Sequence, residues 1–365
     1  MSAANADDAA LLAKLAAMFE DDAPDRPITN LLAKVQRYEL DDLTLPMTLS
    51  DPPDCYICSP TVAYVDYALE ETRHFNARPS LKTAIRLLLR LCRPIMQATG
   101  LDRQVQPNNW LFSTNPVPDL TPDQAKALRD DLTETYPDRA IVIRSINEMT
   151  DASTINALKS AGFALLPARQ IYAYDTRKRP KPTIDMKRDA ALLATGPYDI
   201  VPADDFTDAD FNRAADLYAM LYLEKYTPLN PTYTAAFLTQ AHRIGLLRIV
   251  GLRGADQILD GVVGMFTRGN TMTVPILGYD TSKPQKWGLY RMLNAHAQAE
   301  AIETGRFYNM SAGAARFKRY RNAEPMIEYT AVYVRHRGWR QRIATATVRS
   351  LLDWIGVPLL RRFGL

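Results

Sequence analysis

The sequence predicts a mixed α/β protein built of two lobes. The chain has 365 residues, of which 47% are hydrophobic and 23% are charged, a balance typical of globular proteins. At roughly 150 residues per domain, this length suggests two cores. Both halves also end in the same order of predicted elements: a strand, a helix and an extended segment. These observations favour two related lobes, each a mixed central sheet flanked by helices.

The first half begins with an acidic amphipathic helix, in which apolar residues recur at helical spacing from Leu11 to Phe19. This helix lacks the basic start and compact apolar run of a signal peptide. Residues 21–54, rich in Asp and Pro, are expected to be extended surface chain with a short helix over 31–38. The further elements expected are a helix over 79–96 that Pro94 ends or kinks, a strand over 110–113, a helix opened by Thr121-Pro122-Asp123, a strand over 140–144, a helix over 151–160, and strands over 163–166 and 170–175.

The three cysteines do not form a disulfide framework. Cys55 and Cys58 have C-x-x-C spacing, which is typical of redox sites and of half a zinc site, but no second such pair follows and the four histidines are scattered. A strand with buried thiols is the favoured interpretation, with no metal site. The natural compartment is the cytoplasm.

Residues 176–189 combine bases, prolines and few apolar side chains, and are the predicted linker. The linker would join an N-terminal lobe of residues 1–175 to a C-terminal lobe of residues 190–336, followed by a basic tail of residues 337–365. The second lobe is expected to contain helices over 204–226 and 234–243, strands over 246–252, 258–267 and 271–278, a helix over 287–304, a strand over 307–310, a helix over 314–321 and a strand over 327–335.

The run 277–293, LGYDTSKPQKWGLYRML, is the strongest local motif. A buried strand ends at Gly278, a polar loop with two lysines follows, and a helix begins at Gly288. Helix N-termini bind phosphate because their first N–H groups are unpaired, and glycine allows an anion to approach the backbone. Ordinary α/β packing produces the same strand–glycine–helix junction, so that alternative stays open.

Residues 285–290, QKWGLY, resemble the Q/R-x-x-G-x-G/A signature of the GNAT acyltransferases, matching it at Gln285 and Gly288. Residues 311–322 are similar to the N-x-x-A-x-x-x-Y-x-x-x-G run of that family, with Lys318 where many relatives carry a tyrosine acting as general acid. With the duplicated ending, the chain resembles the two-lobed GNAT enzymes, which include the Fem-type peptidoglycan transferases.

The resemblance implies tandem GNAT-like lobes, the first of them degenerate, and no prosthetic group. The co-substrate would be acyl-CoA or a thioester of an acyl carrier protein. The loop would bind the coenzyme A pyrophosphate between a splayed strand over 271–278 and the helix over 289–304, with the strand over 307–310 across the thioester channel. The implied cofactor-binding residues are Leu277, Gly278, Lys283, Gln285, Lys286, Trp287, Gly288, Leu289, Tyr290 and Lys318.

Amide formation from a thioester requires a polarised carbonyl, an amine that loses a proton and a stabilised thiolate. Besides Lys318, the candidate catalytic residues are Glu328, Glu224 and Asp280. Glu328 alternates with apolar neighbours, so a solvent-facing strand position is the alternative. The predicted acceptor pocket is walled by residues that share one helical face, with core packing as the alternative: Tyr218, Tyr222 and Tyr226.

The C-terminal segment is basic and apolar. Residues 335–365 contain seven arginines and one aspartate, a net +6, so the other 334 residues of this +3 chain sum to −3. Residues 339–365 therefore suit an anionic membrane surface, with packing against the chain's own domain or a partner subunit as the alternative. No stretch reaches the ~18–20 uninterrupted apolar residues of a transmembrane helix, and the near-neutral total argues against a nucleic-acid partner.

We therefore expect an N-acyltransferase that joins an acyl thioester to a primary amine. The basic tail suggests a lipid substrate, and the chain resembles the bacterial ceramide synthases among GNAT members of that profile. Such an enzyme would be cytoplasmic and peripheral on the inner membrane. The alternatives are Fem-type aminoacyl transfer from tRNA in peptidoglycan synthesis and a non-catalytic, membrane-associated GNAT scaffold.

Overall fold

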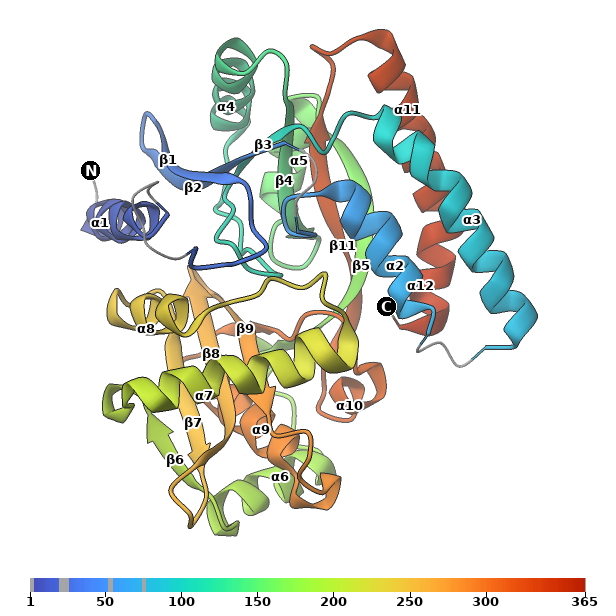
Figure 1. The fold of residues 1–365 in the computed structure, drawn as a ribbon. Coiled ribbons are helices and arrows are strands. Elements are labelled where there is room, and N and C mark those ends of the chain that lie inside the picture. The colour runs from blue at the N-terminus through green and yellow to red at the C-terminus, as the bar shows by residue number, and fades with distance from the viewer. Residues whose placement is uncertain (1–2, 20–25, 52–54, 74–76, 365) are drawn as a thin grey trace.

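The computed structural model describes residues 3–19, 26–51, 55–73 and 77–364, and a single β-sheet runs through both halves of the chain (Figure 1). In these residues eleven strands lie in the order β1-β2-β3-β4-β11-β5-β10-β9-β8-β7-β6. The strands are β1 (Lys34–Leu40), β2 (Leu43–Ser50), β3 (Gln104–Pro107), β4 (Ala140–Asn147), β5 (Ala164–Asp175), β6 (Asp199–Pro202), β7 (Arg248–Arg253), β8 (Leu259–Arg268), β9 (Thr271–Tyr279), β10 (Phe307–Asn309) and β11 (Glu324–Tyr333).

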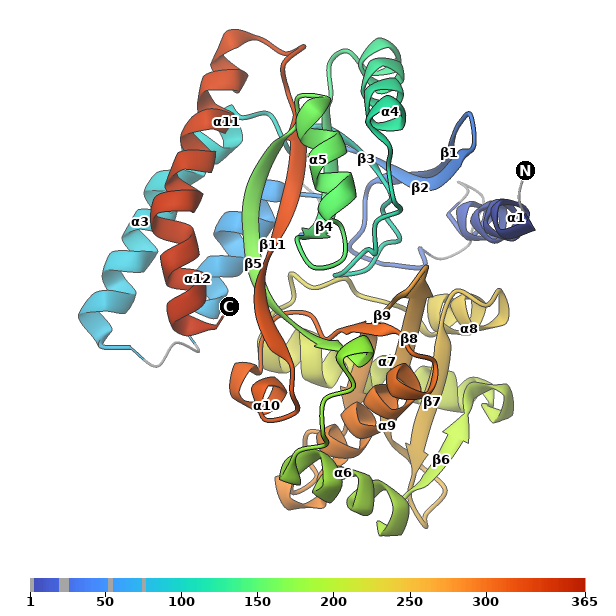
Figure 2. The ribbon, with the colours of Figure 1, turned by 180° about the vertical axis from the view of Figure 1, so that it is seen from behind.

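Helices cover both faces of this sheet (Figures 1 and 2). They are α1 (Ala3–Ala17), α2 (Tyr67–Glu71), α3 (Pro79–Ala98), α4 (Pro122–Thr135), α5 (Ala152–Ser160), α6 (Ile184–Thr195), α7 (Asp208–Ala219), α8 (Ala235–Arg243), α9 (Leu289–Glu303), α10 (Ala315–Arg319), α11 (Trp339–Leu351) and α12 (Val357–Phe363). In the N-terminal lobe α4 and α5 cover one face and α2, α3 and α11 the other; in the C-terminal lobe α7 and α8 lie opposite α6 and α9. The predicted mixed α/β class is confirmed.

The two halves exchange their last strands. Each half ends as predicted in strand, helix and strand, which are β4, α5 and β5 in the first and β10, α10 and β11 in the second. However, β11 pairs with β4 and β5 of the first half, while β5 continues past it to pair with β10 of the second. Ala173 of β5 lies opposite both Glu324 and Asn309. The exchange makes one sheet of the two lobes.

A loop of the first half fills the space between the lobes. Residues 110–113, predicted to be a strand, have no strand partner; instead Trp110 and Phe112 pack against Phe266 of β8, with ring centroids 5.4 and 5.0 Å apart. The left-handed backbone of Leu111 (φ 66°) breaks the extended conformation, and its carbonyl oxygen accepts a hydrogen bond from Tyr233 Oη at 2.7 Å. The strand prediction was wrong because the apolar side chains of this segment pack between the lobes and its backbone joins no strand.

The helix predicted over 31–38 is also wrong. That segment forms β1 of a hairpin whose register pairs Leu40 with Leu43, and Asp41 (φ 51°) provides the positive φ that such a tight turn needs. Val35 and Tyr38 are buried three residues apart, a spacing that is typical of helices, and the Asp-Asp turn was the missed signal. Of the predicted extended chain over 21–54, residues 21–25 and 52–54 lie outside the described residues.

Smaller corrections concern β5 and the cysteines. The strands predicted over 163–166 and 170–175 are one strand, because a shift of register opposite Pro167 accommodates that proline. Cys55 and Cys58 are buried as expected and are not joined by a disulfide, but they lie in a turn rather than on a strand. In the part of the chain that the structure describes, no group of metal-ligating side chains could hold a metal ion.

The segment 176–189 is more structured than a linker of its composition suggests. It contains a 3₁₀ turn at Thr176–Lys178 and the first half of α6. Asp189 of α6 is buried and accepts hydrogen bonds from Arg291 Nε of α9 and Arg321 Nε after α10, both at 2.6 Å. This ion-paired triad holds α6 against the helix that begins at the predicted phosphate loop.

The C-terminal segment is helical throughout and packs against the N-terminal lobe. Residues Trp339–Phe363 run as one helix, in which a π-helical segment, Leu352–Gly356, joins α11 to α12. Val348 belongs to the buried cluster that includes Met96 of α3. By length and composition alone, this helix could cross a membrane, and it is the one helix among the described residues with that property.

Replacing Asp189 with Asn should destabilise the fold by roughly 3–5 kcal/mol, because Arg321 would keep its buried charge without a carboxylate. Urea unfolding followed by circular dichroism measures this change. Asp199→Asn, at an exposed position of β6, is the matched control and should be neutral. Equal midpoints for the two variants would show that the triad does not hold α6 in place.

Candidate active site

β9 and β10 are parallel neighbours that separate after three residue pairs. They pair from Phe307 opposite Thr271 to Asn309 opposite Thr273, whereas β9 continues alongside β8 as far as Tyr279. From residue 274 onward, β9 therefore has no strand beside it on the β10 side. This is the splay expected for the strand over 271–278, and an open strand edge offers backbone N–H groups to a carbonyl oxygen.

The N-terminus of α9 lies beyond this splay and has no side-chain cap. Gln285–Trp287 form a 3₁₀ turn, and Gly288 adopts a left-handed conformation (φ 75°) immediately before the helix. In the N-terminal lobe, by contrast, Thr121 and Gln124 close the start of α4 with a capping box. A capping box occupies part of the unpaired N–H groups at a helix start, so the start of α9 is more open to an anion than the start of α4.

The two lysines of the loop are placed differently. Lys283 Nζ forms an ion pair with Asp260 of β8 at 3.3 Å and lies 5.4 Å from the centre of the Trp287 ring. Lys286 is exposed beside the α9 N-terminus. Lys286 is thus the lysine available to a diffusing anion, while Lys283 mainly anchors the loop.

Both glycines of the motif serve close packing. A Cβ at Gly278 would lie 2.4 Å from backbone atoms of Leu217 and Tyr218, so glycine lets α7 rest on β9. A Cβ at Gly288 would lie 2.5 Å from Leu192 Cδ2 of α6. The ordinary-packing interpretation therefore accounts for both glycines, and a Gly288 substitution would test stability as much as anion binding.

Tyr290 replaces the small residue of the family signature, and it fills space. Its ring packs against Phe317 of α10 and Tyr279 of β9, with centroids 4.8 and 6.1 Å apart. Leu277 and Leu289 are buried in the core of this lobe. These three predicted cofactor-binding residues thus shape the walls of the site through packing, and any ligand contact with them involves the backbone or the tyrosine edge.

The structure brings together a polar cluster where the lobes meet, whose members range from half-buried to buried. Its central ion pair joins Arg169 of β5 to Glu328 of β11, at 2.8 Å from Nε to Oε1 and 3.2 Å from Nη2 to Oε2. Glu328 is only 2% exposed, so the alternative of a solvent-facing strand position is wrong. Burial acts to lower the pKa of Arg169, but Glu328 reverses that effect and raises it. We refer to Arg169, Glu328, Arg144, Tyr56, Glu71, Thr114, Ser311 and Lys318 as the interlobe cluster.

Lys318 is joined to Arg169 by a short chain of contacts. Arg169 Nη2 donates to Thr114 Oγ1 at 2.8 Å, and that hydroxyl lies 3.4 Å from Ser311 Oγ. Lys318 Nζ donates to the carbonyl oxygens of Ser311 (3.1 Å) and Ala312 (2.6 Å). The predicted catalytic residues Glu328 and Lys318 are therefore linked through Arg169, Thr114 and the Ser311 loop that follows β10.

The pKa of Lys318 is lowered from 10.5 to about 7. Burial is the main cause, since the side chain is 5% exposed, and the charge of Arg169 adds to it. A neutral lysine amine has two N–H donors and one lone pair, and the two carbonyl oxygens account for both donors. Lys318 therefore has a lone pair to accept a proton near neutral pH.

Several members of the cluster come from the first half and were missed from the sequence. Arg144 of β4 donates to the carbonyl oxygens of Ile57 (3.0 Å) and Ser113 (3.3 Å), and lies 5.6 Å from the centre of the Tyr56 ring. Burial raises the pKa of Glu71 to about 7 although Arg169 opposes the shift. Neither motif nor periodicity marked these residues; the Tyr56 C-x-x-C segment was the nearest signal.

The predicted substrate-binding tyrosines lie on α7 and the π-helical segment that continues it, Met220–Tyr226. Tyr218 is buried and stacks on Tyr222 at 4.9 Å, while Tyr226 is exposed. Burial raises the pKa of Tyr222, and Arg169 is among the charges that act on it, so Tyr222 lies within electrostatic range of the cluster. Tyr218 belongs to the core, as the alternative had it.

Two other candidate bases, Glu224 and Asp280, are poorly suited to accept a proton from the amine. Glu224 is exposed on the π-helical segment. Asp280 accepts hydrogen bonds from Ser282 and an ion pair from Arg213 at 2.7 Å; although burial acts to raise its pKa, these contacts outweigh it and hold the pKa of Asp280 below its usual range. A carboxylate stabilised in this way is a poor proton acceptor at neutral pH.

The depressed pKa of Lys318 predicts a pH signature in stability. Between about pH 7 and 10.5 the folded chain has released a proton that the unfolded chain still binds. The free energy of unfolding should therefore rise with pH in this window, relative to Lys318→Gln, by up to about 1.4 kcal/mol per pH unit. Urea titrations across the window measure this difference, and the shift of Glu71 cancels because both proteins carry it.

Lys318→Gln retains two N–H donors for the carbonyl oxygens. The comparison with the wild type therefore separates the titration of Lys318 from the loss of its hydrogen bonds. Lys159→Gln, exposed on α5, should run parallel to the wild type at every pH. Parallel curves for the Lys318 variant and the wild type would show that Lys318 titrates at its ordinary value.

The comparisons with known proteins identify a domain and a fold. Residues 185–319 match the family model of the acetyltransferase (GNAT) domain. The crystal structure of FemX has the same fold, with a TM-score of 0.56 at 9% sequence identity over 94% of this chain and 99% of FemX. No curated protein sequence matches the chain.

Two further solved structures are similar over part of the chain. L-PGS from Bacillus licheniformis has a TM-score of 0.44 at 11% identity, over 66% of this chain and 78% of that one. A tandem GNAT protein from the clavulanic acid biosynthesis pathway has a TM-score of 0.35 at 11% identity, over 58% of this chain and 68% of that one. Residues 185–319 therefore contain a GNAT acetyltransferase domain, and the chain as a whole has the two-lobed fold of FemX.

Proposed function

We propose that this enzyme makes an amide by transferring an acyl group from a thioester to a primary amine carried on a long-chain lipid, as in bacterial ceramide synthesis. The observation that carries the proposal is the position of Lys318. This buried lysine, with a pKa of about 7, lies at the end of β10, where β9 and β10 separate. A general base is most effective when its pKa is near the working pH.

In the proposed reaction the acyl thioester lies in the splay between β9 and β10. Backbone N–H groups on the open edge of β9 bind the carbonyl oxygen and stabilise the charge that develops on it. The amine nitrogen attacks the carbonyl carbon, so that a C–N bond forms and the C–S bond breaks. Lys318 accepts the proton that the amine loses and returns it to the departing thiolate.

The other cluster residues position these groups. Glu328 has both oxygens bonded to Arg169, so we assign it the role of fixing that guanidinium rather than of a base. Through Thr114, Arg169 lies beside the Ser311 loop that Lys318 binds. Tyr222 and Tyr226 offer an apolar wall with hydroxyl groups, which suits an amphiphilic amine.

The donor site is proposed at the N-terminus of α9, where Lys286 and the uncapped helix would bind the phosphates of coenzyme A. Delivery by an acyl carrier protein would use the same exposed lysine. The basic C-terminal helix would bring the enzyme to the cytoplasmic face of the inner membrane, where a long-chain amine is found.

Fem-type aminoacyl transfer is the second candidate, because FemX shares the fold over 94% of this chain. That reaction also ends in an amide, but its donor is an aminoacyl-tRNA. The near-neutral charge of the chain, +3, favours a donor smaller than RNA.

Lys318→Gln should lower the rate of amide formation by about 10²–10⁴-fold, the usual contribution of a positioned base. The measurement is mass spectrometry of the amide formed from a long-chain acyl-CoA and a long-chain amino alcohol. Lys159→Gln should retain the wild-type rate. If the lysine variant also retained it, Lys318 would have no part in the proton transfer.

Lys286→Glu should weaken binding of acyl-CoA by about five- to tenfold with little effect on stability, since its side chain is exposed. Isothermal calorimetry measures the dissociation constant, and Lys159→Glu is the control with the same charge change. Unchanged affinity would place the donor elsewhere. Loss of activity on adding ribonuclease to an assay in cell extract would instead favour aminoacyl-tRNA as the donor.

A further inference from the structure

A second surface, remote from the interlobe cluster, is formed by α3 together with the helix Trp339–Phe363. The two helices lie side by side and antiparallel on the outer face of the N-terminal lobe (Figures 1 and 2). Each buries one face: Ile85 and Met96 on α3, and Ala344 and Val348 on α11. The opposite faces point away from the protein.

These outward faces hold large apolar side chains. Leu87 and Leu91 of α3 are 57% and 62% exposed, and Trp339, Ile343 and Trp354 of the C-terminal helix are 61%, 58% and 82% exposed. With Ile355, the two helices carry six of the fourteen large exposed hydrophobic residues found in the described chain. Such a concentration on neighbouring helices marks an interaction surface.

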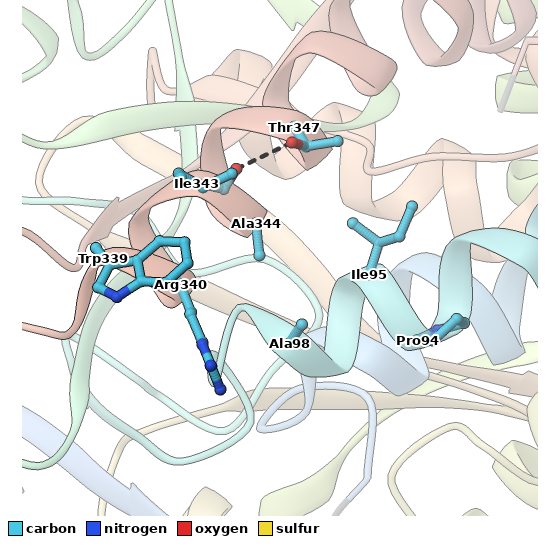
Figure 3. Close-up of a pocket in the computed structure, with 8 residues that line it drawn as sticks. All are labelled: Pro94, Ile95, Ala98, Trp339, Arg340, Ile343, Ala344 and Thr347. Atoms are coloured by element: carbon cyan, nitrogen blue, oxygen red, sulfur yellow. Dashed lines mark hydrogen bonds between the residues drawn. The ribbon is translucent and has the colours of Figure 1, made fainter.

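A groove of about 490 Å³ runs between the helices and joins the two apolar stripes. Pro94, Ile95 and Ala98 line it from α3, and Trp339 and Ile343 from α11 (Figure 3). In this view Trp339 and Arg340 lie at one end of the groove and Pro94 at the other. The groove is wide enough to hold aliphatic groups and offers few polar partners.

The same helices concentrate positive charge. Residues Pro79–Ala98 contain four bases and no acid, and Trp339–Phe363 contain five bases and one acid. Their net charge is therefore +8, while the whole chain has +3. Two bases are ion-paired, Arg93 with Asp66 and Arg349 with Asp353. Six others are exposed on the same helices: Arg86, Arg90, Arg340, Arg342, Arg361 and Arg362.

We propose that α3 and the C-terminal helix form one docking face for an anionic lipid bilayer, with the apolar stripes in the interface and the arginines at the lipid phosphates. Apolar side chains bordered by arginine are the chemistry that an anionic lipid surface binds. The new element is α3: the N-terminal lobe supplies half of the membrane contact. The inference rests on the proposed function only in taking the substrate to be a lipid.

Two other occupants fit the surface less well. A second copy of the chain would place two faces of net +8 against each other, and the like charges would repel. Insertion of Trp339–Phe363 across the bilayer would pull Ala344 and Val348 out of the core of the N-terminal lobe. A helix pair lying in the plane of the bilayer keeps that core intact.

The test is flotation of the full-length protein with lipid vesicles. Wild type should bind vesicles of phosphatidylcholine mixed with phosphatidylglycerol, bind phosphatidylcholine alone weakly, and lose affinity at high salt. The double variant Leu87→Gln/Leu91→Gln should bind the anionic vesicles at least about tenfold more weakly. Ile184→Gln/Ile258→Gln, at exposed positions of the other lobe, is the matched control and should bind as wild type does.

Normal binding by the α3 variant would overturn the proposal. If Trp354→Gln lost binding in the same experiment while the α3 variant bound normally, docking would be assigned to the C-terminal helix only. If gel filtration showed that the α3 variant dissociates a dimer, the surface would be a subunit interface instead. Amide formation from the long-chain substrates dissolved in neutral detergent, without vesicles, separates this inference from the proposed function. Absence of that activity in the wild type would overturn the function and leave the docking result standing.

Discussion

The insertion of β11 between β4 and β5 is the constraint on which the rest of this structure depends. Because the last strand of the chain completes the sheet of the first lobe, β5 is free to extend into the second lobe and pair with β10. The hydrogen bonds of one continuous sheet therefore hold the lobes in a fixed relation. The same insertion places Glu328 opposite Arg169, and so builds the interlobe cluster from strands that belong to different halves of the sequence.

The two lobes share the same arrangement of backbone elements, but the residues that follow the separated strands differ. Both lobes contain a pair of parallel strands that separate early, β3 with β4 and β9 with β10. In the first lobe, a long loop and the capped N-terminus of α4 follow the splay, whereas the second lobe keeps a glycine and an uncapped helix there. An anion needs unpaired N–H groups, and the capping box leaves fewer of them at the start of α4 than remain at the start of α9.

Charge inside the protein is balanced around a few arginines. Arg169 is neutralised by Glu328, and Arg321 by Asp189, which meets the requirement that buried ions be paired. The hydrogen bonds that Lys318 Nζ makes to described residues go to carbonyl oxygens, and its burial favours loss of the proton. The burial that destabilises the charged form of Lys318 is thus also what would let this lysine accept a proton near neutral pH, as is common in active sites.

The sequence by itself determined the local elements. Caps and glycines marked α4, α5 and α9, the strands β7 to β9 were expected near their observed positions, and the loop motif with the duplicated ending led to the GNAT fold. Each of these depends on neighbouring residues, which periodicity and capping describe well. Residues 110–113 were mistaken because their partners lie in the other lobe. Residues 31–38 were mistaken although their hairpin is local, because the helical spacing of two buried residues outweighed the Asp-Asp turn.

The candidate site also contains residues that the sequence predicts and residues that only tertiary contacts reveal. Lys318 and the loop at Gly288 were found from the sequence because they belong to a contiguous motif. Arg169, Arg144 and Glu71 carry no local signal, and only the exchange of β5 and β11 brings them to the same point. Tertiary structure also decided which tyrosines are core and which face the cluster, and turned a basic tail into half of a two-helix surface, since burial and charge pairing depend on contacts between residues far apart in the chain.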